Sequence, residues 1–102
     1  MIQHIVLLQP KEEATEEEIQ AALEHVKTLQ EKIPGILSIR TGKNLNTSNN
    51  HGFTYGFVME FADVEHLKAY APHPEHKPVS VELRRLCTNI LDFDLTSTAG
   101  CC

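Results

Sequence analysis

The sequence predicts one α+β domain with the element order β-α-β-β-α-β and a four-stranded antiparallel sheet with its helices on one face. Three observations support this prediction. The chain opens with a strongly apolar strand, one long amphipathic helix follows, and shorter segments separated by proline and polar turns complete it. The length of 102 residues accommodates one such domain. Its composition, 41% apolar and 23% charged, is that of a globular protein, which argues against disorder over most of the chain.

The first strand is expected to run from Ile2 to Leu8 with apolar side chains on both faces. Because side chains alternate along a strand, Val6 lies on the same face as Ile2 and Leu8, whereas Ile5 and Leu7 lie on the opposite face. A strand of this kind is typical of the middle of a sheet that is covered on both sides. Pro10 ends it.

A long amphipathic helix comes next. Thr15 and Glu18 have the spacing of a capping box, which predicts the start of the helix, and Pro34 followed by Gly35 predicts its end. Apolar residues recur between these points at helical spacing and form a stripe of about four turns. We expect this stripe to be buried in the core: Ile19, Ala22, Leu23, Val26, Leu29 and Ile33.

Two further strands are expected at residues 36–43 and 53–61, joined by a polar loop. The second of them alternates, with large apolar residues on one face and Val58 among the residues of the other. The apolar face comprises Phe53, Tyr55, Phe57, Met59 and Phe61.

The last part of the chain predicts a broken helical crossover and a final strand. Asp63 can cap a short helix that ends at Tyr70, and prolines interrupt the chain before a second helix at 78–86. The last strand is expected at 88–95. With the two helical segments counted as one crossover, the order is ferredoxin-like, and right-handed crossovers place the helices on one side of the sheet with the first and third strands central. We expect a domain at 1–95 and a flexible tail at 96–102.

This arrangement leaves one apolar face without cover. The helices protect one side of the sheet, yet the first strand is apolar on both sides, and the third strand carries Val58 opposite its aromatic row. A sheet from a second copy would cover the remaining face, so the sequence predicts a homodimer formed by sheet–sheet packing.

Charge and motif content argue against several functional classes. The net charge of −5 and the lack of a Lys/Arg cluster argue against nucleic-acid binding. The apolar run 5–8 is too short to span a membrane, and three cysteines do not form a disulfide framework, so we expect a cytoplasmic protein without membrane association. No glycine-rich phosphate loop or Cys-x-x-Cys motif occurs, and we expect no cofactor.

The segment His73-Pro-Glu-His76 contains the most informative polar residues. An imidazole with a pKa near ~6.5 is suited to taking a proton α to a carbonyl at neutral pH, and Tyr70 could donate a hydrogen bond to the resulting enolate oxygen. The alternative is that both histidines hold the loop through backbone carbonyls and that Tyr70 is a core residue with its hydroxyl at the surface.

Two other polar residues fall on apolar faces. His4 shares a parity with Val6, and Tyr55 lies in the aromatic row, so each is either a satisfied core residue or part of a pocket lining. His4, His73 and His76 together would suit zinc, but no cysteine or acidic ligand is placed beside them, and we expect no metal site.

The order of these segments resembles the stress-responsive α/β-barrel (Dabb) family over about residues 1–95. The resemblance is spread along the chain, from His4 in the first strand to the histidine-bearing loop after Tyr70. It also includes Ile33-Pro34, Gly42-Lys43, Gly52-Phe53-Thr54 and Leu91-Asp92-Phe93-Asp94. Members of the family form dimeric α+β barrels in which two sheets face each other, and the resemblance implies this fold here.

For activity, the resemblance implies the chemistry of the family's cofactor-free polyketide cyclase. That enzyme has a pocket between helices and sheet, a histidine general base and a tyrosine that steadies an oxyanion. The matching positions are His76 and Tyr70, and the histidine of its first strand matches His4. Val26 stands where the cyclase has a pocket tyrosine, and Tyr55 stands where it has a histidine, so a different ligand is implied.

Two hypotheses therefore remain. The first is a cofactor-free enzyme or a binder of a small apolar or β-keto ligand, with a pocket between the first helix and the sheet that uses His76 and Tyr70. The second is a non-enzymatic, stress-associated structural dimer or oligomer. An open cavity of roughly a few hundred cubic ångströms beside His76 would favour the first, and bulky side chains filling that space would favour the second.

Overall fold

The computed structural model describes residues 1–96. The expected flexible tail lies outside the described residues from position 97 onward, whereas Thr96 belongs to the last strand. The elements in chain order are β1 (Ile2–Pro10), α1 (Glu16–Lys27), α2 (Leu29–Lys32), β2 (Ile36–Lys43), β3 (Tyr55–Phe61), α3 (Val64–Tyr70), α4 (His76–Leu86) and β4 (Cys87–Thr96). The α+β prediction and its element order are confirmed.

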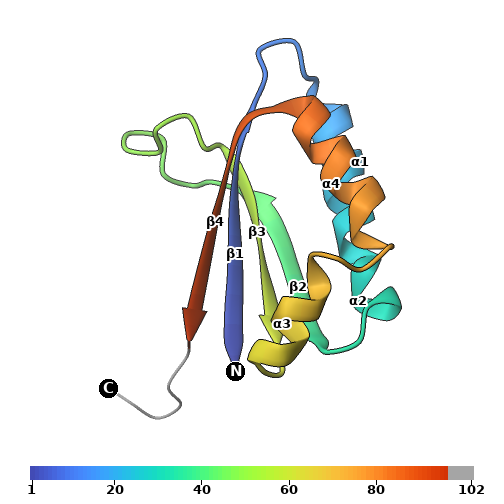
Figure 1. Ribbon diagram of the computed structural model, residues 1–102. Helices are drawn as coiled ribbons and strands as arrows, with labels where there is room; N and C mark the ends of the chain where they lie inside the picture. The colour runs from blue at the N-terminus through green and yellow to red at the C-terminus, as the bar shows by residue number, and fades with distance from the viewer. Residues whose placement is uncertain (97–102) are drawn as a thin grey trace.

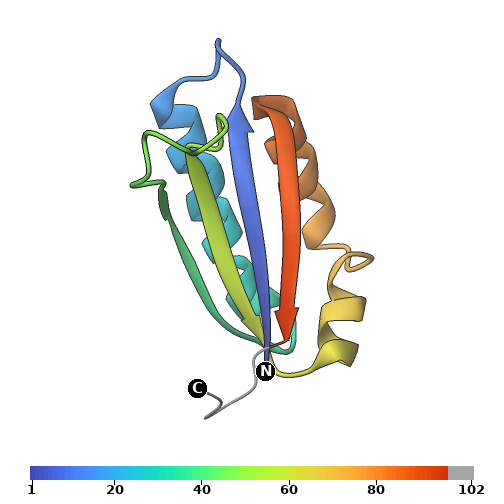
Figure 2. The same cartoon turned by 90° about the vertical axis from the view of Figure 1, so that its left-hand side faces the viewer.

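The four strands form one antiparallel sheet in the order β2-β3-β1-β4. The first and third strands are central, as predicted. All helices lie on one side of the sheet (Figure 1), and the other side is open (Figure 2). The chain therefore has two layers, and the core lies between them.

Side chains of β1 point alternately to the helical side and to the open side of the sheet. Ile2, Val6 and Leu8 are buried beneath the helices, whereas Ile5 and Leu7 are half-buried on the open side. Because β1 pairs with β3 on one edge and β4 on the other, its backbone hydrogen bonds are satisfied on both sides.

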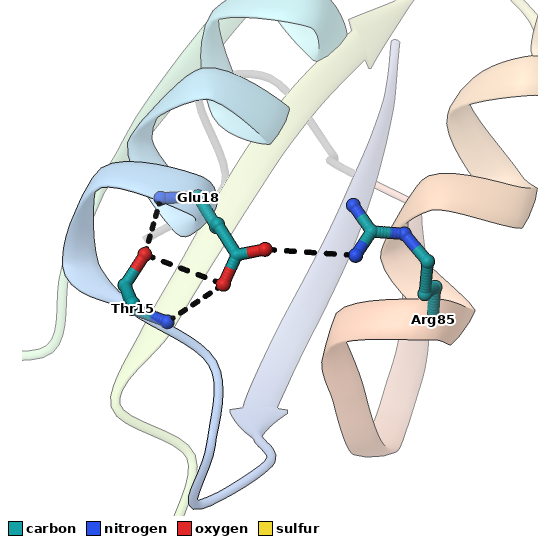
Figure 3. A network of polar contacts seen from close by, with 3 residues as sticks. All are labelled: Thr15, Glu18 and Arg85. Carbon is teal, nitrogen blue, oxygen red and sulfur yellow. Dashed lines mark hydrogen bonds and ion pairs between the residues drawn. The ribbon is translucent and has the colours of Figure 1, made fainter.

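The capping box at the start of α1 is present (Figure 3). The Thr15 hydroxyl oxygen accepts from the Glu18 backbone N–H at 3.1 Å, and the Glu18 carboxylate accepts from the Thr15 N–H at 3.0 Å. The predicted helix is divided at Thr28, whose hydroxyl donates to the His25 carbonyl at 2.6 Å. This local bond ends α1, and α2 continues the same apolar stripe to Leu29.

All six residues of the predicted stripe are buried, and none is more than 3% exposed. Leu23 lies in the middle of the stripe. Replacing Leu23 with alanine should lower the free energy of unfolding by about 2–5 kcal/mol, because the lost methyl groups leave a cavity between α1 and the sheet. Chemical denaturation measures this value. A cost within the error of that measurement would show that Leu23 is not part of the core.

Three predicted boundaries are wrong by two residues, and the first of these is the end of β1, which lies at Pro10 instead of Leu8. β3 begins at Tyr55 instead of 53, because a turn with Gly52 at φ +87° and a bond from the Phe53 N–H to the Asn50 carbonyl occupies the chain before it. α4 begins at His76 instead of 78. Pro78 fits in its first turn, where a backbone N–H has no partner within the helix.

The open side of the sheet carries a continuous apolar patch. In the register of the sheet, Ile5 lies between Val58 and Phe93, and Leu7 lies between Gly56 and Leu91. Phe93 is 54% exposed. We call this patch the open face and define it by Ile5, Leu7, Val58, Leu91 and Phe93.

Candidate functional site

A cavity of about 640 Å³ lies between the helices α3 and α4 and the strands β1 and β4. Its side chains divide into an apolar part and a polar end. The apolar part includes Val6, Phe57, Val79, Leu83 and Ile90. The polar residues His4, Tyr70 and His76 also line it.

Tyr70 lies between the two imidazoles. The centroid of its ring is 4.4 Å from that of His76 and 5.5 Å from that of His4. α3 brings Tyr70 over the sheet, because Asp63 caps this helix by accepting from the His66 N–H at 2.9 Å. The turn between α3 and α4 then places His76 against the tyrosine.

The geometry of His76 determines which ring nitrogen bears its proton. Nδ1 lies 3.0 Å from the Ala71 carbonyl oxygen, and because a carbonyl can only accept, the Nδ1–H donates. The lone pair is then on Nε2. Burial lowers the pKa of His76 from 6.5, the Ala71 bond opposes this shift, and the charge of Arg84 is among the smaller contributions that favour the neutral form. His76 is therefore a neutral base near pH 7.

Tyr70 is a hydrogen-bond donor at this site. It is 4% exposed, and burial, assisted by the negative charge of Asp92, raises the pKa of its hydroxyl well above the usual 10. The phenol therefore stays protonated at any ordinary pH. Within residues 1–96 the hydroxyl has no hydrogen bond to a protein atom, so it is available to a ligand oxygen.

His4 is held by a carboxylate that the sequence reasoning missed. Its Nδ1 lies 2.5 Å from Asp94 Oδ1, and the strand register places the two residues opposite each other on β1 and β4. Asp92 lies two residues before Asp94, and both residues line the cavity. In β4, aspartates at 92 and 94 alternate with the apolar residues Leu91, Phe93 and Leu95. This alternation was the signal in the sequence that one face of the strand is polar and lines a cavity.

The other predicted pocket residues do not line the cavity. Val26 is fully buried, and the α1 stripe packs closely on the sheet, so no space opens beside it. Tyr55 is buried in β3, with the Lys43 ammonium 5.8 Å from the centroid of its ring. His73 holds the turn by accepting from the Glu75 N–H at 3.1 Å. The expected pocket between the first helix and the sheet is instead a pocket beneath α3 and α4.

Within the part of the chain that the structure describes, no group of three His, Cys, Asp or Glu residues is arranged to hold a metal ion. Among the helices of residues 1–96, none is long and apolar enough to cross a membrane.

Comparison with known proteins gives matches over nearly the whole chain. The family described as Stress responsive A/B Barrel Domain matches residues 2–97. The olivetolic acid cyclase of Cannabis sativa is 27% identical over 96 residues, which are 93% of this chain and 95% of that protein.

Solved structures also match. A dimeric ferredoxin-like protein of unknown function from Jannaschia sp. CCS1 is 32% identical, with a TM-score of 0.83 over 94% of this chain and 98% of that one. The hydroxynitrile lyase of Passiflora edulis is 19% identical and shares the fold, with a TM-score of 0.87 over 96% of this chain and 94% of its own.

Proposed function

The chain belongs to the stress-responsive A/B barrel domain family, and from that premise we propose that it is a cofactor-independent enzyme that binds a small carbonyl compound beneath α3 and α4 and removes a proton next to the carbonyl. The observation that supports this most is the convergence of two groups on one cavity. One is a neutral imidazole with an unprotonated Nε2, and the other is a phenol that stays protonated.

The proposed step needs only these groups. His76 Nε2 takes the proton from the carbon α to the carbonyl, and the electron pair of the broken C–H bond moves to the carbonyl oxygen as an enolate. Tyr70 donates a hydrogen bond to that oxygen, and the imidazolium of His76 later returns its proton to the product. His4, held by Asp94, forms the other wall beside Tyr70.

A substrate of the β-keto type suits this site. A second carbonyl makes the C–H bond between the two carbonyls more acidic, so a base of ordinary strength such as an imidazole can remove its proton. The apolar part of the cavity accommodates an alkyl or aryl body, and its volume of about 640 Å³ lies in the range of small-molecule sites. The relative named olivetolic acid cyclase supports an enzymatic role over a purely structural one.

We also propose that the protein is a homodimer in which two open faces pack together. Leu91 and Phe93 of that face are exposed in the single chain, and two structural neighbours are described as dimeric ferredoxin-like proteins. Packing two sheets face to face would remove this apolar surface from water.

Deuterium uptake at the α carbon of ethyl 3-oxohexanoate in D₂O tests the proton transfer. The rate above the uncatalysed background should rise with pH and then level off, because only neutral His76 is a base. Since burial lowers the pKa of His76, the midpoint should lie below 6.5 and the plateau should include neutral pH. His4 and Arg84 near the ring favour the neutral form, and Asp92 opposes them.

The exchange is followed by proton NMR with the uncatalysed rate measured beside it at each pH. An exchange rate equal to that background at every pH would refute the proposed function. A midpoint above 6.5 would show that a different group is the base.

A further inference from the structure

Helix α4 presents a polar row to the cavity. His76, Ser80 and Arg84 follow at intervals of four residues, which places them on one face of the helix, and all three line the cavity. Val79 and Leu83 form an apolar row beside them. The proposed reaction uses His76 at the beginning of the polar row and leaves the other end, Arg84, without a role.

Two adjacent arginines on this helix differ in their surroundings. Arg85 points away toward α1, where its Nη1 lies 3.6 Å from the Glu18 carboxylate (Figure 3). Arg84 lines the cavity and forms no ion pair with any residue of 1–96. Lys68 of α3 also lines the cavity and likewise has no ion pair among the described residues.

The carboxylates of the lining lie on the opposite wall. Asp92 and Asp94 both come from β4, and Asp94 is engaged by His4. Positive charge is thus confined to the helical side of the cavity, where no protein carboxylate within ion-pair distance neutralises it.

We propose that the substrate carries a carboxylate, which Arg84 binds at the helical rim with Lys68 adding positive charge, while the reacting carbon lies against His76. This assignment rests on the proposed function and names its substrate class. A guanidinium presents two parallel N–H donors to a carboxylate, and a carboxylate supplies the acceptors that Arg84 lacks here.

The helix geometry limits the length of such a substrate. His76 and Arg84 are eight residues apart, or about 12 Å along the axis. Both side chains lean toward the N-terminus of the helix, and the longer arginine reaches further along it, so the carboxylate and the reacting carbon are separated by roughly 5–8 Å. A keto acid whose carboxylate lies several carbons from the ketone, with apolar carbon against Val79 and Leu83, meets these requirements.

Calorimetric titration with 7-oxo-7-phenylheptanoate and its primary amide tests the proposal. The two probes have the same shape and differ in charge. The unaltered protein should bind the carboxylate at least about tenfold more tightly than the amide, and Arg84→Gln should remove this preference. Arg85→Gln is the matched control: it removes the same charge from the next residue and should keep the preference.

Equal affinity for the two probes would overturn the proposal, as would failure of both to bind or an equal loss in the two arginine variants. The proton transfer is judged separately. Ethyl 3-oxohexanoate has no carboxylate, so its deuterium uptake does not depend on this subsite. His76→Gln should abolish that uptake and still prefer the carboxylate probe.

Discussion

Replacing Leu7 with lysine is expected to convert the proposed dimer into a monomer at micromolar concentration. Leu7 lies at the middle of β1 on the open face, between Gly56 and Leu91 in the register of the sheet. In a face-to-face dimer each copy would bury one ammonium group in apolar surroundings, at a cost on the order of several kcal/mol for each copy. The combined cost of burying the two ammonium groups lowers the association constant of the dimer by several orders of magnitude.

Sedimentation velocity measures this change, and Val81→Lys is the matched control. Val81 is 61% exposed on α4, on the helical side of the sheet, so a lysine there should leave the dimer intact. Circular dichroism on both variants would verify that the fold is kept. A monomer for the unaltered protein, or equal dissociation by both lysines, would contradict the proposed interface.

The proposed dimer interface and the candidate site share one strand. Along β4 the side chains alternate, with Asp92 and Asp94 directed to the cavity and Leu91 and Phe93 part of the open face. β4 is an edge strand that pairs with β1 alone. A second copy packed on its apolar side would hold this strand in place and, with it, the carboxylate that engages His4.

The fold was predictable because its determinants are local. The capping box at Thr15 and the apolar stripe of α1 can be read from neighbouring residues, and both are present in the structure. The division at Thr28 was missed, because a single side-chain bond to a backbone carbonyl leaves the apolar periodicity unchanged.

The site was predictable only in part. His76 and Tyr70 lie close together in the sequence and match the family pattern, whereas the pairing of His4 with Asp94 joins residues 90 positions apart. It depends on the register between the first and last strands, which periodicity does not specify. Val26 was expected in the pocket by correspondence with a relative, but the close packing of α1 on the sheet buries it in the core.

Replacing His76 with glutamine should lower turnover of a carbonyl substrate by roughly 10²–10⁴-fold, the usual contribution of a positioned base. Glutamine is close to histidine in size and remains polar, but its amide is not a base at neutral pH. His73→Gln is the matched control, since His73 lies in the same turn and does not line the cavity. An equal loss in the two variants would mean that the histidines act by holding the loop.

Replacing Tyr70 with phenylalanine separates the oxyanion role from packing. The ring contacts with Phe61 at 5.2 Å and with His4 and His76 need no hydroxyl, so the variant should fold with nearly unchanged stability. Its turnover should fall by about 10²–10³-fold, as when one oxyanion donor is removed. Because the base and the donor act in one step, Tyr70→Phe combined with His76→Gln should lose much less than the product of the two effects. Losses that multiply would show that the two residues act independently, and the common site beneath α3 and α4 would then be wrong.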